Sequence, residues 1–164
     1  MESGNQAVNK MDNLNKNLYL EKWGNEFIIP QLEEIVSKIK INHNDILSYS
    51  RIETTKNDTI FSWLISTVLK PYMFENTDIH EVVLSISFQI KGRNIFLDGD
   101  ISLEDGRILY EIDRYFILDL NSKEECIHIN NLLLQFFDMS FYFIQKGINL
   151  ISEENKKGNV SDFN

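Results

Sequence analysis

Four carboxylates lie close together in the middle of the chain, two on each side of an Asp-Gly pair. Asp98 and Asp100 come before it, and Glu111 and Asp113 come after it. One residue separates the acids within each pair, so on a β-strand both side chains point to the same face. Carboxylates gathered in this way can hold Mg²⁺ against a phosphate, or they can attract a basic protein partner.

The turn between the two pairs sets their relative positions. Asp-Gly at 105–106 tolerates the positive φ angles of a tight type I′ turn, and it predicts a hairpin. In the register that follows, Asp100 lies across from Glu111 and Asp98 lies across from Asp113. We call these four residues the acidic square. Like charges directly opposite each other destabilise a sheet by roughly 0.2–1 kcal/mol per pair, so either solvent screens them or a cationic group binds there.

Apolar and polar residues alternate along the segments that hold these acids and along the segment before them. A period of two is typical of half-buried strands. The alternation predicts a three-stranded antiparallel meander, with strands over about 82–90, 95–103 and 107–118. One face is expected to be apolar, and the other carries the acidic square beside Ser85 and Ser87.

Gly99 falls in mid-strand on the apolar face, between Ile86 and Ile112 in this register. A missing side chain at such a position indicates a bulge or the close approach of another backbone or side chain. We therefore expect the last helix of the chain to pass close to Gly99, or the strand to bulge there.

The residues before the meander are expected to be helical. Leu20, Trp23 and Phe27 lie on one side of a first helix, and Pro30 predicts a break near Ile29 with a new helix starting at the proline. The break follows because the proline ring disfavours helical geometry in the residue before it.

Two further segments complete the part that precedes the meander. Residues 44–55 fit either an extended strand or a short helix ending in a loop, and we favour the helix. Asn57 or Asp58 then caps a helix in which apolar residues recur at helical spacing as far as Leu69, and Pro71 ends it.

After the meander, Ser122 and Glu125 form an S-x-x-E capping box, which predicts a long helix over about 122–148. Most of its surface is apolar, so it needs cover on most sides and is expected to lie against the apolar face of the strands. Asn130 and Gln135 interrupt the roughly 20 apolar residues that a membrane crossing needs. A homodimer formed along this helix is a further possibility.

The predicted fold is therefore α+β, with N-terminal helices, the three-stranded meander and a long, mostly buried C-terminal helix. We expect a single domain over 17–151, a disordered arm over 1–16 and a disordered tail over 152–164.

Composition limits the possible partners. The 164 residues carry a formal net charge of -9, which argues against direct binding to a nucleic-acid backbone and favours a basic protein partner. Cys126 is the only cysteine, so one chain can form neither an internal disulfide nor a cysteine-based zinc site. A reducing, cytoplasmic location suits this composition, and no membrane partner is expected.

The remaining candidates for chemistry are isolated. His43, His80 and His128 have no i, i+4 spacing to one another and no HExxH context, and Cys126 has no partner that would activate it. No phosphate-binding glycine loop or nucleophile elbow is present in the sequence. We expect no catalytic residues, no metal and no cofactor, and hence a protein that is not an enzyme.

The functional hypothesis that fits best is an acidic protein-binding inhibitor of the bacterial toxin-immunity type, which neutralises a basic toxin such as a nuclease by direct binding. The acidic square would steer the partner, Phe96 and Tyr115 would anchor it, and Glu104 would lie at the edge of the surface. The alternatives are a Mg²⁺-dependent phosphodiester hydrolase that uses the same carboxylates, and an inhibitor that mimics DNA.

Overall fold

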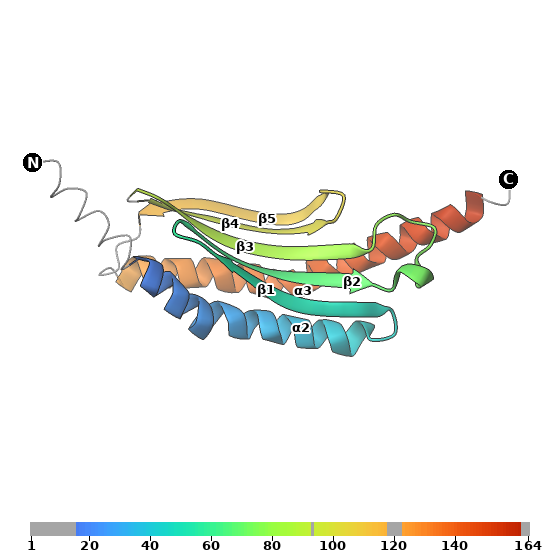
Figure 1. Ribbon diagram of the computed structural model, residues 1–164, viewed down its shortest axis with the longest axis horizontal. Helices are drawn as coiled ribbons and strands as arrows, with labels where there is room; N and C mark the ends of the chain where they lie inside the picture. The colour runs from blue at the N-terminus through green and yellow to red at the C-terminus, as the bar shows by residue number, and fades with distance from the viewer. Residues whose placement is uncertain (1–15, 93, 118–122, 162–164) are drawn as a thin grey trace, which may run out of the picture.

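The computed structural model describes residues 16–92, 94–117 and 123–161. They form an α+β fold in which two long helical segments cover one face of a five-stranded antiparallel sheet, with the strands in the order β1-β2-β3-β4-β5 (Figure 1). The strands are β1 Leu47–Lys56, β2 Ile60–Leu69, β3 Glu81–Lys91, β4 Asn94–Leu103 and β5 Ile108–Ile117. The α+β class is as predicted, but the three-stranded sheet is wrong because two more strands precede the meander.

Strand β2 replaces the helix that was predicted to end near Leu69. Its buried side chains, including Phe61, Trp63 and Ile65, alternate with less buried ones, as the period of a strand requires. The helical interpretation arose because Leu64 and Val68 on the other face are also apolar, so the same residues match a helical spacing. Aromatic and β-branched residues fill the segment and favour the strand.

Strand β1 replaces the short helix that was favoured for residues 44–55. Asn57, which was expected to cap a helix, instead closes the β1–β2 turn: its side-chain Oδ1 accepts the N–H groups of Thr59 and Ile60 at 2.9 and 2.8 Å. Asparagine can stabilise a turn or a helix start through the same hydrogen bond, so its identity did not discriminate between them.

The register of the meander is as predicted from Ile90↔Ile95 at one end to Ile101↔Tyr110 at the other. Beyond Ile101 it shifts by one residue, so that Ser102 rather than Leu103 lies opposite Ile108. This β-bulge sits beside the Asp-Gly turn, where Gly106 has a φ of 89°. The bulge leaves the pairs of the acidic square unchanged.

A single helical stretch precedes β1. Residues 16–23 are helical, a π-helical turn follows at η1 Gly24–Ile28, and α2 Ile29–His43 continues with Pro30 in its first turn. The predicted break near Ile29 is therefore wrong. In the π turn the N–H of Ile29 donates to the carbonyl of Gly24, and this wider turn accommodates the proline without ending the helix.

The C-terminal helix α3 is longer than predicted, because it runs over Lys123–Ser161 instead of ending near residue 148. Residues 152–161, which we expected in a disordered tail, continue the helix. Arg107 Nη2 lies 2.6 Å from Glu154 Oε1, and Asn155 accepts the N–H of Asn76 at 3.0 Å. These contacts tie the end of α3 to the sheet and to the β2–β3 connection, which includes the short 3-10 helix η2 Pro71–Met73. The predicted cap at Ser122 lies outside the described residues.

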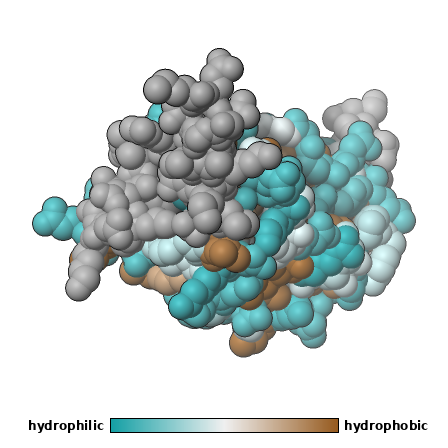
Figure 2. Space-filling view, turned by 60° about the vertical axis from the view of Figure 1, so that its left-hand side comes forward, coloured by the Kyte–Doolittle hydropathy of each residue, from teal (hydrophilic) through white to brown (hydrophobic). Residues whose placement is uncertain are grey.

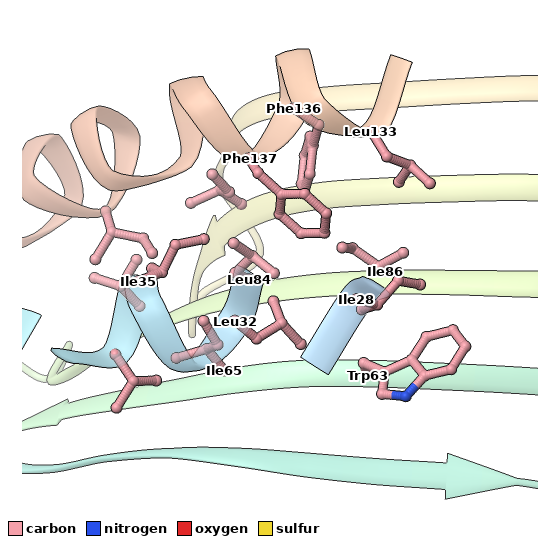
Figure 3. Close-up of a cluster of buried hydrophobic side chains, with 14 of the residues drawn as sticks. Ile28, Leu32, Ile35, Trp63, Ile65, Leu84, Ile86, Leu133, Phe136 and Phe137 are labelled. Atoms are coloured by element: carbon pink, nitrogen blue, oxygen red, sulfur yellow. The ribbon is translucent and has the colours of Figure 1, made fainter. Parts of the chain in front are cut away.

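The core lies between the sheet and the two helices (Figure 3). Helix α2 packs against β1 and β2, and α3 packs against β3, β4 and β5. Gly99 lies at a tightly packed point of this core. A Cβ added at Gly99 would lie 2.9 Å from Ile112 Cγ1 and 3.4 Å from Phe136 Cε2 of α3. The expected close approach of the last helix to Gly99 is thus confirmed. Among the side chains that fill the core are Ile28, Leu32, Ile65, Leu84, Ile86, Leu133 and Phe136.

The surface seen in Figure 2 is mostly hydrophilic, and hydrophobic residues reach it only as small separate patches. Within the ranges that the structure describes, no helix combines the length and the apolar character that a bilayer crossing needs.

Candidate partner-binding surface

The candidate surface is the outer face of the sheet, opposite the face that the helices cover. Along β3, β4 and β5 the outward residues alternate with the buried residues of the core. The helices of the described chain pack on the inner face and leave this outer face uncovered (Figure 1).

The acidic square forms on this face in the register predicted from the sequence. Asp98 lies opposite Asp113, and Asp100 lies opposite Glu111. On the other side of β4, Ser87 lies opposite Asp98 and Ser85 lies opposite Asp100, so two hydroxyl side chains flank the carboxylates.

Burial and mutual repulsion shape the electrostatics of the square. Partial burial raises the pKa of Asp98, and the charge of Asp113 raises this pKa further. Burial also raises the pKa of Asp100, with the charges of Asp98 and Glu111 adding to the rise. A 3.3 Å hydrogen bond from Ser102 Oγ opposes the shift at Asp100. Each cause that raises these pKa values disfavours the ionised carboxylate, so a bound cation would stabilise the face.

None of the four acids forms an ion pair with a lysine or arginine in the part of the chain that the structure describes. The described surface ion pairs involve other acids, such as Glu34 with Lys38 and Glu53 with Arg51. Among the described side chains, no lysine or arginine neutralises the charge of the square.

The predicted anchors differ in where they lie. Phe96 is half-buried on the outer face of β4, and Lys91 Nζ lies 5.7 Å from its ring centroid. Tyr115 lies opposite Phe96 in the β4–β5 register, and its side chain falls outside the described part of the structure. The structure thus places Phe96 on the same strand and face as Asp98 and Asp100.

Glu104 does not join the square. Its carboxylate accepts the backbone N–H of His80, and its Oε1 lies 4.0 Å from His80 Nδ1. Its own N–H donates to the carbonyl of Glu81 at 3.1 Å. Glu104 therefore ties the β4–β5 turn to the β2–β3 connection.

The outer face also contains residues that the sequence interpretation missed, because they lie on the strands predicted as helices. Tyr49, Arg51 and Glu53 form a row along β1, while Leu64 and Val68 are half-buried on β2. The sequence signal that could have revealed strand β2 is the spacing of its large apolar residues. Phe61, Trp63 and Ile65 occupy every second position, and the structure shows that all three are buried.

The three histidines lie on different segments of the structure. Over the described ranges, no group of three or more His, Cys, Asp or Glu side chains is arranged to hold a metal ion. His80 Nε2 lies 3.0 Å from the carbonyl of Phe74, burial lowers the pKa of His43, and His128 is exposed on α3. The side chain of Cys126 lies outside the described part.

The repulsion within the square makes a prediction about stability and pH. The double substitution Asp98→Asn and Asp100→Asn should stabilise the protein by about 1 kcal/mol at pH 7, because it removes like-charge contacts. A carboxyl whose folded pKa is raised binds more protons in the folded state, so wild-type stability falls as pH rises from about 4 through the raised pKa values. The advantage of the variant should therefore disappear as the pH is lowered to about 4, as urea unfolding at several pH values can measure.

Asp105→Asn provides the control for this experiment, because Asp105 accepts a 2.9 Å hydrogen bond from Arg107 Nε and should not gain stability when neutralised. Equal or lower stability of the double variant at pH 7 would argue against repulsion within the square.

Comparisons of the chain with protein-family models, with curated proteins and with solved structures find no match.

Proposed function

We propose that this chain is an acidic binding protein of the toxin-immunity type, which neutralises a basic protein partner by direct contact with the outer face of its sheet. The observation that carries the proposal is the acidic square: four carboxylates lie in two directly opposed pairs on the face of the sheet that the described helices do not cover. Lysine or arginine side chains from a partner would relieve the repulsion among these charges and so make the free energy of binding more favourable.

The residues around the square support a protein ligand. Phe96 offers a half-buried aromatic ring beside the acids, and Ser85 and Ser87 offer hydrogen-bonding groups on the neighbouring strand. An apolar anchor surrounded by polar groups is the usual composition of a protein-binding surface. A basic toxin, such as a nuclease, would present the complementary charge.

The wider composition agrees with this role. The net charge of -9 would steer a cationic protein toward the chain over a distance of about 10 Å at moderate ionic strength. With Cys126 as its single cysteine, the chain suits a reducing compartment such as the cytoplasm, where an inhibitor would meet a toxin before it acts.

The experiment that tests the proposal captures the partner and maps its position together. A photo-crosslinking amino acid replaces Ser87 on the outer face in one form of the tagged full chain, and replaces the exposed Ser37 of α2 in another. Both forms are expressed with the native genomic neighbours of the gene and irradiated. We expect a basic polypeptide to be linked in stoichiometric yield from position 87 and much less from position 37.

Capture of a basic partner that crosslinks only from position 37 would reject the outer face as the binding surface. If neither form of the tagged chain retains a basic polypeptide, the proposed function itself is contradicted.

A further inference from the structure

Strand β5 is an edge of the sheet that the structure describes. It is the last strand in the order β1-β2-β3-β4-β5, and Figure 1 shows it along the top of the sheet. Residues 108–113 of β5 are all exposed or half-buried, whereas every second residue of the neighbouring β4 is buried. An edge strand presents a row of backbone N–H and C=O groups with which another chain can pair.

The hydrogen bonds of β4 identify the backbone groups of β5 that point to this edge. The N–H of Leu103 donates to Arg107 C=O at 2.9 Å, on the β5 side of β4. Bonding alternates along an antiparallel strand, so residues 99 and 101 of β4 also bond to β5, and their partners there are residues 112 and 110. The backbone N–H and C=O groups of Glu111 and Asp113 consequently point away from β4, to the open edge.

The side chains at this edge are acidic on one face of the sheet and apolar on the other. Glu111 and Asp113 are exposed on the outer face, whereas Asp98 and Asp100 of β4 are half-buried. The half of the acidic square that lies at the edge is therefore its more accessible half. Between the two edge acids, Ile112 is half-buried on the inner face.

We propose that the basic partner adds an extended segment to β5 as a further antiparallel strand. A lysine or arginine of this segment lies directly opposite each of Glu111 and Asp113, and an apolar residue lies opposite Ile112. Backbone hydrogen bonds supply affinity and the alternating side chains supply specificity, as in other complexes formed by strand addition. This inference rests on the proposed function and specifies what the partner presents, namely a segment in which basic and apolar residues alternate.

Charge selects a basic segment over a second copy of this chain as the occupant of the edge. A two-fold pairing of β5 with itself about Ile112 would set Glu111 against Asp113 of the second copy, and like charges in that position repel. A basic segment instead forms an attractive pair at both positions. The two edge acids therefore oppose self-association and favour a cationic strand.

The opposite edge of the described sheet, strand β1, does not offer an equivalent site. Ser50 of β1 is 4% exposed, and α2 packs against this strand, so part of the edge is covered. The acid of β1, Glu53, already has a basic partner, because Arg51 Nε lies 2.7 Å from Glu53 Oε1. A basic segment therefore gains less from pairing with β1 than from pairing with β5.

A synthetic peptide tests strand addition on the wild-type full chain. The probe is a short peptide in which lysine and valine alternate. Titration calorimetry should detect binding of this peptide, and NMR should show slower hydrogen exchange at the backbone amides of Glu111 and Asp113 in the complex. Absence of binding would overturn the proposal.

Two methylated forms of the peptide separate backbone pairing from charge attraction. N-methylation of the lysines removes the N–H groups that would donate to the carbonyls of Glu111 and Asp113, and it should weaken binding about tenfold or more. N-methylation of the valines, whose N–H groups would point away from β5, is the matched control and should leave the affinity nearly unchanged. Equal affinities of the two methylated peptides would show that charge alone holds the peptide, and would overturn strand addition.

Glu111→Pro and Glu111→Gln make the same comparison on the protein. Both substitutions remove the charge, but only proline removes the N–H at the edge, where a sheet tolerates this residue. The peptide should bind Glu111→Pro about tenfold more weakly than Glu111→Gln. Circular dichroism verifies the folding of both variants, and the methylated peptides decide the question on the wild-type chain if the proline variant unfolds.

The captured basic partner separates this inference from the proposed function. Equal affinity of that partner for Glu111→Pro and Glu111→Gln would overturn strand addition and leave the proposed function standing. Failure to capture any basic partner would contradict the proposed function, and with it the addition of a partner strand.

Discussion

Gly24→Ala is expected to destabilise the protein by about 2 kcal/mol or more, although alanine favours a helix over glycine by about 1 kcal/mol. The reason is the contact between Gly24 and the indole of Trp63. A Cβ at position 24 would lie 2.2 Å from Trp63 Cζ2 and 2.9 Å from its Cε2. No side chain is tolerated at that distance, so the π-helical turn would have to move away from the sheet.

The indole cannot move to make room, because other rings surround it. Trp63 is 2% exposed, and its ring centroid lies 6.1 Å from that of Phe88 and 6.5 Å from that of Phe61. Densely packed interiors relax only partly around an added methyl group. The substitution therefore probes how closely the first helical stretch docks on β2.

A double-mutant cycle separates this contact from helix propensity. In the background of Trp63→Leu, which removes the obstructing ring, Gly24→Ala should become neutral or stabilising, so the coupling between the two sites is about 3 kcal/mol. Urea unfolding of the four proteins measures it, with the neighbouring exposed Asn25→Ala as a control for propensity alone. Additive effects of the two substitutions would show that the contact contributes nothing.

The parts of the fold that the sequence predicts correctly are those in which local signals agree. Along β3, β4 and β5 the alternation of apolar residues and the Asp-Gly turn point to the same pairing, because a slip of one residue would expose the core side chains. The same register brings Asp98, Asp100, Glu111 and Asp113 together, and this is why the acidic square is predictable from the sequence.

The failures have equally specific causes. Strand β2 carries apolar residues on both faces, with Leu64 and Val68 outside and Phe61 and Ile65 inside, so both a helical and a strand period fit it. Tertiary contacts decided in favour of the strand, because β2 pairs with β1 and β3 on both sides.

The end of α3 was missed for a different reason. Residues 152–161 are mostly polar, and the contacts that order them are hydrogen bonds and an ion pair to segments distant in the sequence, such as Asn155 with Asn76 and Glu154 with Arg107. The contact of Glu104 with His80 is of the same kind, since His80 lies 24 positions earlier in the sequence. Contacts of this kind have no periodic signature.

Neutralising the acidic square is the second change with a large expected effect, and it concerns binding. The variant carries four substitutions: Asp98→Asn, Asp100→Asn, Glu111→Gln and Asp113→Asn. It should bind the captured basic partner about 100-fold more weakly, a loss of about 2.7 kcal/mol in binding free energy. The loss combines slower electrostatically steered association with faster dissociation. Wild-type affinity should also fall steeply with added salt, whereas the affinity of the variant should depend on salt much less.

The dissociation constant of this variant tests the central claim most directly when it is compared with that of a charge-matched control. The control neutralises four exposed helical acids by glutamine, namely Glu26, Glu33, Glu34 and Glu153, and so changes the net charge equally. Isothermal titration calorimetry should give about 100-fold weaker binding for the acidic-square variant and nearly wild-type binding for the control. Equal dissociation constants for the two variants would contradict the outer face as the binding surface.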